Sequence, residues 1–155
     1  MDDNMSFAVL CYYGDIEGVQ EAIDNGVDVN EASEEASDAG ETGLMNALCH
    51  NHNYVVWVLL QHPEIDINKV DLSGGSALHW AMAADNDEGL AALLAHRDEL
   101  TTFNQRDEFH GRTPIMEAVI RNSVKCFHLL LINPLVDLDT RDNYERTPQE
   151  VQRYV

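Results

Sequence analysis

Lysine and arginine are absent from the first 68 residues of this sequence, which carry fourteen aspartate and glutamate side chains. Residues 69–155 carry fourteen acids and nine bases, so the chain of 155 residues has a formal net charge of −19 at pH 7. A surface of this sign repels phosphate backbones and anionic lipid headgroups. We therefore expect neither nucleic acid nor a membrane as a partner. A basic protein segment would be attracted, although high charge also serves solubility alone.

Cysteines and long apolar runs are also scarce. The three cysteines are an odd number, which fits a reducing compartment better than a disulfide framework. No apolar run approaches the roughly 18 residues that span a bilayer. The Met-Asp-Asp start is not a basic region followed by an apolar stretch, as a secretory signal would be. We expect an intracellular, cytoplasmic protein, with the nucleus left open.

Motifs for catalysis and cofactor binding are missing as well. The sequence has no glycine-rich phosphate loop, no Gly-x-Ser-x-Gly elbow and no His-Glu-x-x-His. Cys49, His50 and His52 resemble a metal cluster, but they span the end of an expected helix and its turn, so their side chains should diverge. Structural zinc needs four converging ligands. The sequence therefore predicts no enzyme, no cofactor and no metal.

A short phrase is present instead, repeated at a near-fixed interval. It reads Gly40-Glu-Thr-Gly-Leu-Met-Asn-Ala and begins again at Gly74 and at Gly111, spacings of 34 and 37 residues. A weaker copy begins at Glu145, another 34 residues later. Repetition at this period is typical of stacked helical units, which bury a shared core and expose an extended surface.

Each copy predicts two short helices joined by a sharp turn. A hydroxyl that can cap a helix N-terminus stands at Thr42, Ser76, Thr113 and Thr147. Residues that tolerate positive φ follow the first helix at Gly14, Asn51, Asp85 and Asn122. Second helices are expected over 16–23, 55–60, 90–94 and 124–131. Extended stretches are expected over 27–30, 65–68, 102–104 and 136–139.

This organisation resembles the ankyrin repeat, from about Phe7 to Val155. The resemblance implies an all-α repeat solenoid, in which each helix-turn-helix unit carries an extended β-finger and all units stack in a single domain, residues 1–155. The implied repeats are about 4–36, 37–70, 71–106 and 107–141, with a terminal cap at 142–155. Ser76-Ala-Leu-His79 approaches the Thr-Pro-Leu-His tetrapeptide of the family. Met45 and Met116 replace that histidine, so its bond to the hydroxyl is absent there.

The contact pattern of the family, carried over position by position, implies a concave protein-binding surface. On the ends of the first helices it selects Tyr12, Tyr13, Cys49, His50, Ala83, Ala84, Ile120 and Arg121. On the fingers it selects Asp38, Glu41, Leu72, Gly75, Phe109, Arg112, Asn143 and Arg146. Aromatic and arginine side chains dominate binding hot spots. Alternatively, the tyrosines cover the exposed end of the first repeat, and the finger hydrophobes are isolated surface residues.

Three further features are singled out. The finger after Asn30 is four residues longer than the next and brings together Glu31, Glu34, Glu35 and Asp38. It would steer a basic segment, or it is a solvated insertion. Tyr54 and Trp57 are expected on the outer, convex side, as a second interface or flat against neighbouring side chains. Asn68 matches the family's asparaginyl hydroxylation sites, with Leu60 and Asp66 before it, or it braces the finger by hydrogen bonds.

The sequence thus favours a monomeric protein-interaction module that recognises another protein, with a basic segment as one form of partner. Two alternatives stay open. One is a small regulator that inhibits an enzyme by occupying it. The other is a scaffold segment of a larger protein, without a partner of its own.

Overall fold

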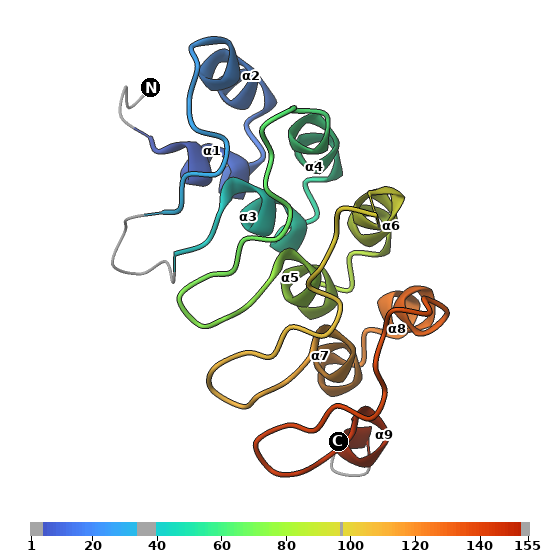
Figure 1. Ribbon diagram of the computed structural model, residues 1–155. Helices are drawn as coiled ribbons and strands as arrows, with labels where there is room; N and C mark the ends of the chain where they lie inside the picture. The colour runs from blue at the N-terminus through green and yellow to red at the C-terminus, as the bar shows by residue number, and fades with distance from the viewer. Residues whose placement is uncertain (1–4, 34–39, 97, 153–155) are drawn as a thin grey trace.

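The structure is a computed structural model that describes residues 5–33, 40–96 and 98–152. Helical hairpins stack side by side, with the first and the last described helix at opposite ends of the stack (Figure 1). The helices are α1 (Phe7–Tyr13), α2 (Ile16–Asp24), α3 (Gly43–Cys49), α4 (Asn53–Leu60), α5 (Ala77–Ala83), α6 (Asp87–Ala95), α7 (Pro114–Arg121), α8 (Val124–Leu131) and α9 (Pro148–Val151). None of these described helices is long and apolar enough to cross a membrane.

The helices form two rows, as the predicted all-α repeat solenoid requires. In one row α1, α3, α5, α7 and α9 pack in order, and in the other α2, α4, α6 and α8 do. The loops between one hairpin and the next are called fingers, and the three that follow the second, third and fourth hairpins project to the same side of the first row (Figure 1). The fingers and the adjoining first-row helices form the surface that we call the concave surface. Isolated antiparallel bridges, Ala32 with Thr42 and Val70 with Ser76, close the bases of two fingers.

The sharp turns between paired helices are left-handed, as predicted. Gly14, Asn51, Asp85 and Asn122 have φ of 68°, 59°, 49° and 56°. Asparagine and aspartate occupy this region more readily than other side chains. The chain therefore reverses within two or three residues, and the second helix lies against the first.

The helix starts agree with the predicted capping in three of four repeats. Thr42 and Thr147 each accept a hydrogen bond from the backbone N–H three residues on, at 3.4 Å. Ser76 Oγ lies 2.9 Å from Nδ1 of His79, which also accepts from the Ser76 backbone N–H. The prediction is wrong for Thr113, whose buried hydroxyl has no hydrogen-bond partner in the described structure. Its helix begins with Pro114, whose fixed φ favours the first turn.

The core runs through the stack between the two rows. The apolar residue and the alanine of each repeated phrase are buried: Leu44, Ala47, Leu78, Ala81, Ile115 and Ala118. Cys11 and Cys126 are buried in the same core. Burial raises the pKa of each thiol to about 12, and the Asp85 carboxylate adds to the rise at Cys126. Both therefore stay protonated and act as small apolar side chains.

Three asparagines join each outer turn to the next. Asn30 Nδ2 donates to the Glu64 carbonyl at 2.7 Å, and its Oδ1 accepts from the Asp66 N–H at 2.7 Å. Asn68 and Asn104 make the same pair of bonds to the following repeat, at 2.7–2.8 Å. The sequence predicts extended segments over 27–30 and 65–68. In the structure the last two residues of each, 29–30 and 67–68, form a turn instead. The turn aims the asparagine along the stack.

A left-handed residue near the tip of each finger provides a test of backbone strain. Gly40, Gly74 and Gly111 have positive φ, and Glu145 takes their place in the last finger with φ of 62°. A side chain in this region costs roughly 1–2 kcal/mol, and the greater freedom of unfolded glycine offsets part of it. We expect Glu145→Gly to raise the free energy of unfolding by about 0.5–1 kcal/mol, measured by urea titration.

The matched control is Gly26→Ala. Gly26 has φ of 80°, and a Cβ there would meet nothing within 4 Å, so backbone strain is the only new cost. This change should lower the stability by a similar amount. Stability that is unchanged or lower in Glu145→Gly would contradict the assignment of strain.

His79 provides a test of pH dependence. Burial lowers its pKa below the ordinary value, although the Arg112 carbonyl and three nearby carboxylates act in the opposite direction. In the unfolded chain its pKa is about 6.5. Below that pH the unfolded chain binds a proton that the folded chain excludes, so stability is complete above pH 6.5 and falls as the pH decreases.

We expect the urea midpoint to fall between pH 7.5 and pH 5.5, and to fall less in His79→Met. Methionine occupies the equivalent positions 45 and 116, so the variant fits the fold. An equal pH dependence in the two proteins would remove His79 as its source.

Candidate protein-binding surface

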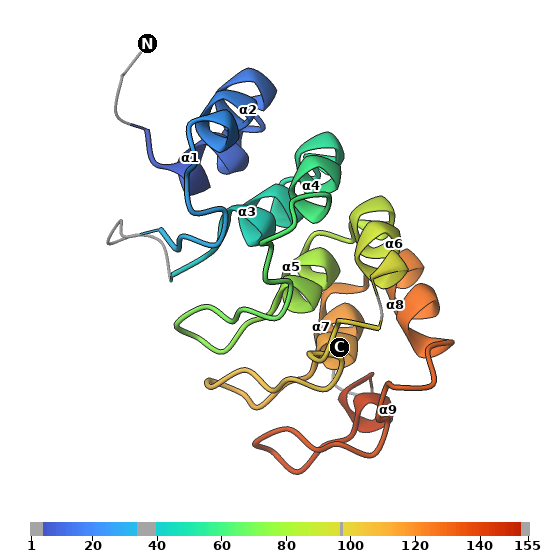
Figure 2. The same ribbon diagram turned by 45° about the horizontal axis from the view of Figure 1, so that its top comes forward.

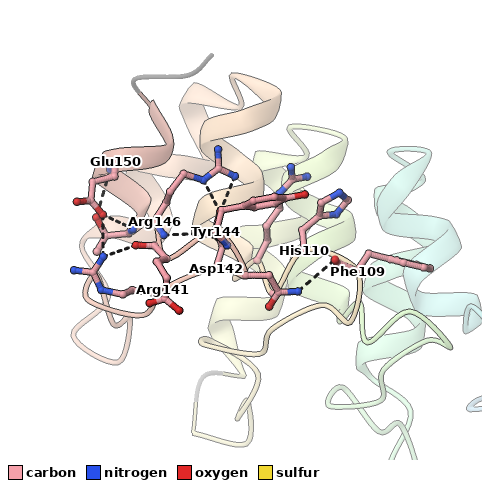
Figure 3. Close-up of polar contacts among 12 residues, drawn as sticks. Phe109, His110, Arg141, Asp142, Tyr144, Arg146 and Glu150 are labelled. Carbon is pink, nitrogen blue, oxygen red and sulfur yellow. Dashed lines mark hydrogen bonds and ion pairs between the residues drawn. The ribbon is translucent and has the colours of Figure 1, made fainter.

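An aspartate closes each of the last three fingers, and it is buried in two of them (Asp71 and Asp142) and half-buried in the third (Asp107). Asp71, Asp107 and Asp142 each donate a backbone N–H across the finger at 2.9 Å, while the carboxylate accepts from the N–H groups of the tip. Burial alone would raise the pKa of Asp142. The hydrogen bonds from Arg146 and from the Tyr144 N–H outweigh that effect and lower this pKa (Figure 3). The tips are therefore held in one shape.

The first finger differs from these three. Ser33 stands where they have aspartate, and its N–H donates to the Glu41 carbonyl at 2.9 Å. Residues 34–39, which include the predicted contacts Glu34, Glu35 and Asp38, lie outside the described residues. The proposed acidic guide therefore stays a prediction. Glu41, at the end of this finger, is half-buried.

Neighbouring fingers are hydrogen-bonded to each other. The Glu108 N–H donates to the Ser73 carbonyl at 2.8 Å, and the Asn143 N–H donates to the His110 carbonyl at 2.8 Å. Arg106 Nη2 donates to Asn143 Oδ1 at 2.9 Å. The fingers thus form one platform, on which the positions of the tip side chains are fixed relative to each other.

Large apolar side chains stand exposed on three consecutive tips. Leu72 is 78% exposed, Phe109 74% and Tyr144 62%. The sequence predicted the first two and missed Tyr144, because glycine spacing aligned Asn143 with Phe109. Counted from the buried aspartate of its own finger, Tyr144 takes the place of Phe109, two residues on. That count is the signal in the sequence that identifies it.

The surroundings of Tyr144 join the last two fingers. Its ring centroid lies 6.5 Å from that of His110, and the two rings lie side by side in Figure 3. The Arg146 guanidinium lies 4.7 Å from the centre of the Tyr144 ring, at a cation–π distance. Arg146, selected by the family pattern, therefore supports a ring as well as closing the finger through Asp142.

A pocket of about 240 Å³ lies between two neighbouring fingers and the helices α5 and α7. The residues that line it are Asp71, Ser73, Gly75, His79, Trp80, Ala83, Asp107, Phe109, His110, Arg112, Glu117 and Arg121. The structure thus brings together five of the positions that the family pattern selects: Gly75, Ala83, Phe109, Arg112 and Arg121. Leu72 and the half-buried Ile120 are not among the lining residues.

Glu117 connects the two arginines of the pocket, and the sequence analysis did not single it out. Its Oε1 lies 2.7 Å from Arg121 Nε, and its Oε2 lies 3.8 Å from Arg112 Nη1. The four-residue spacing from Glu117 to Arg121 on one helix was visible in the sequence. The pairing with Arg112 depends on how the finger meets the helix. Both guanidinium groups are thereby oriented, and their charge is partly balanced.

Trp80 forms a wall of the pocket, and a hydrogen bond to Asp71 fixes its position. Its indole Nε1 donates to Asp71 Oδ2 at 2.9 Å, and the ring is half-buried. Beside it, His79 Nε2 lies 2.9 Å from the Arg112 carbonyl, so a bond between repeats sets the position of the next finger.

The predicted contacts of the first two repeats form a separate aromatic cluster. Tyr12 and Tyr13 meet edge to face with centroids 5.0 Å apart, and the Tyr12 and His50 centroids are 4.1 Å apart. His52 Nε2 lies 2.9 Å from the Tyr12 carbonyl, which ties α1 to the next hairpin. Both tyrosines are exposed. The cluster therefore joins the first repeat to the second and leaves both tyrosine rings exposed.

The residues that resemble a metal cluster are engaged elsewhere. His50 Nδ1 lies 3.0 Å from the Asn46 carbonyl, and His52 is bonded to Tyr12. Cys49 is half-buried, and burial, followed by the charge of Glu41, raises its pKa. Within residues 5–33, 40–96 and 98–152, no group of three or more His, Cys, Asp or Glu side chains is placed to hold a metal ion.

Two remaining predictions fall on the outer side of the stack. Tyr54 and Trp57 are exposed on α4, on the row away from the fingers. Asn68 uses both ends of its carboxamide in the bridge to Glu99 and Thr101, so the bracing role holds. Its hydroxylation stays a prediction.

Comparison with known proteins agrees with this geometry. A family model described as ankyrin repeats matches residues 6–107 in three copies, and a single ankyrin repeat matches residues 110–143. An ankyrin repeat protein of Fowlpox virus is 32% identical over 146 residues, which are 94% of this chain and 41% of that protein. The photoreceptor ankyrin repeat protein of Homo sapiens is 36% identical over 84 residues, 54% of this chain and 18% of that protein.

A third relative is similar over a shorter stretch. An ankyrin repeat domain-containing protein of Stachybotrys chartarum is 36% identical over 73 residues, 47% of this chain and 4% of that protein. The chain spans less than half the length of each of these three relatives.

The two tryptophans provide a matched test of the pocket wall. Trp80→Phe removes the donor to the buried Asp71 carboxylate, so the free energy of unfolding should fall by about 1.5–3 kcal/mol. Trp57→Phe makes the same chemical change on an exposed ring and should cost less than about 0.5 kcal/mol. Urea unfolding followed by far-ultraviolet circular dichroism measures both. Equal losses would mean that the bond to Asp71 does not stabilise the wall.

Proposed function

This chain belongs to the ankyrin repeat family, and on that basis we propose that it binds another protein through its concave surface. Ankyrin repeat proteins are in general protein-interaction modules and not enzymes. Stacked repeats of this kind expose an extended surface on which a partner touches several units at once.

The row of exposed tip side chains is the observation that carries this proposal. Leu72, Phe109 and Tyr144 remain largely exposed although the fold has an apolar core available to it. Their fingers are held by the aspartates Asp71, Asp107 and Asp142 and by hydrogen bonds between fingers. A partner that binds them therefore orders little of the surface, and less of the binding free energy is lost to ordering.

The pocket beside the row supplies specificity in this proposal. About 240 Å³ accommodates one side chain of a partner, between the rings of Trp80 and Phe109. Arg121 stands at its edge with its orientation set by Glu117. Aromatic side chains and arginine are the residues that dominate protein–protein hot spots, where the partner buries them. We place the principal contacts at Phe109, Tyr144 and Arg121, with Tyr12 and Tyr13 as a further contact region on the first repeat.

The test is affinity capture from a cell extract with mass-spectrometric identification. The binding variant carries Phe109→Ala and Arg121→Glu. The control variant, Ile132→Ala with Lys125→Glu, makes the same two kinds of change on exposed side chains of the outer row. Each variant must unfold thermally at the same temperature as the parent chain.

We expect a protein that is retained by the parent and the control but binds the Phe109, Arg121 variant at least about tenfold more weakly, because hot-spot losses exceed about 2 kcal/mol. Titrating that protein, if it is an enzyme, then separates inhibition from tethering. Equal capture by all three chains would contradict the concave site.

A further inference from the structure

The outer face of α4 presents two aromatic rings to solvent. Tyr54 is 57% exposed and Trp57 is 55% exposed, and their centroids lie 6.0 Å apart with the planes at 38°. Trp80 shows the contrast, because its ring is half-buried and its N–H is bonded to Asp71. Packing of the helices against one another therefore leaves the Tyr54 and Trp57 rings accessible to another molecule. The face lies in the row of helices away from the fingers (Figure 2).

The register of the repeats places a carboxylate on each side of this pair. The second residue after the N-cap of each outer helix is, along the stack, Glu17, Tyr54, Glu88 and Lys125. Because α4 packs between α2 and α6, Tyr54 lies between Glu17 and Glu88. Glu88 is also held by a bond between its Oε2 and Asn53 Nδ2, at 2.9 Å. Both carboxylate-bearing residues are exposed.

Small side chains on the next helix keep the tryptophan accessible. The fifth residue after each N-cap is Gln20, Trp57, Ala91 and His128 in turn. Ala91 and Ala95 are exposed on the outer face of α6, so the residue of α6 in register with Trp57 and the one a turn further on carry only a methyl group. A planar group can reach the ring from there.

The helix that carries the pair and the two described helices packed against it, α2 and α6, contain no lysine or arginine. Residues 1–68 contain no lysine or arginine, so none belongs to α1–α4. Lys125, on α8, is paired with Asp87 at 3.3 Å. Aromatic faces attract cations within about 6 Å of the ring centre, and flanking carboxylates add to that attraction.

We propose that the Tyr54–Trp57 pair, with Glu17 and Glu88 beside it, is a second binding site that takes an arginine side chain of a basic protein segment. Arginine fits better than lysine because its guanidinium is planar, weakly hydrated and stacks on aromatic faces. The carboxylates pair with the same cation or with its neighbours in the segment. This site lies on the row of helices that faces away from the concave surface. The proposal is therefore independent of the function proposed above.

The probe is an acetylated hexa-arginine amide, titrated into the ¹⁵N-labelled chain and followed by nuclear magnetic resonance. The two indole N–H signals are assigned with Trp57→Phe. We expect the Trp57 indole signal to move on titration and the Trp80 signal to stay. Tyr54→Ser with Trp57→Ser should weaken binding about two- to fivefold or more, and hexa-lysine should bind the parent chain more weakly than hexa-arginine.

Charge-matched variants separate this site from general attraction to an acidic protein. Glu17→Gln with Glu88→Gln removes two flanking charges, and glutamine can still accept the bond from Asn53. Asp139→Asn with Glu145→Gln removes two exposed charges at the other end of the stack. The first pair should weaken hexa-arginine binding more than the second. Equal weakening, a Trp57 signal that does not move, or equal binding of the two peptides would overturn the proposal.

Discussion

The asparagine bridge between successive outer turns is the interaction on which the arrangement of the fingers depends. At Asn30, Asn68 and Asn104 one carboxamide both donates to and accepts from the main chain of the next repeat. The turn that each bridge fixes leads directly into the next finger, so each repeat sets where the following one begins. The equivalent position of the fourth unit is Asp139, whose carboxylate has no N–H to donate. The described part of the chain therefore makes this bridge between its first four units.

The repeats were predictable from the sequence because their signals are local. A left-handed turn depends on one residue and its neighbours, and Gly14, Asn51 and Asn122 have the positive φ that their residue types predict. The binding surface was less predictable because it depends on distances between repeats. Tyr144 was missed because one finger is a residue longer than its neighbour. The ion pair between Arg112 and Glu117 was missed because it joins a finger to a helix.

The helix starts show how differently one position can be filled within a single fold. His79 accepts from the Ser76 N–H at 3.1 Å and reaches the next repeat through its other ring nitrogen. Met45 takes only the first of these bonds, from the Thr42 N–H to its sulfur at 3.5 Å. A thioether is a weak acceptor and has no second polar end. The histidine therefore ties the third repeat to the fourth in a way that a methionine cannot, and the middle of the stack gains a link that the second repeat lacks.

The aspartate at the base of a finger lets the loop fold independently of the side chains that are exposed to a partner. Its carboxylate binds backbone N–H groups, which every residue except proline supplies, so the loop closes with different side chains at the exposed positions 72, 109 and 144. Evolution can therefore exchange the residues at positions 72, 109 and 144 without redesigning the scaffold beneath them. The same scaffold can carry different combinations of tip residues. The binding specificity of this chain could therefore be changed by substituting a few exposed positions that do not contact the core.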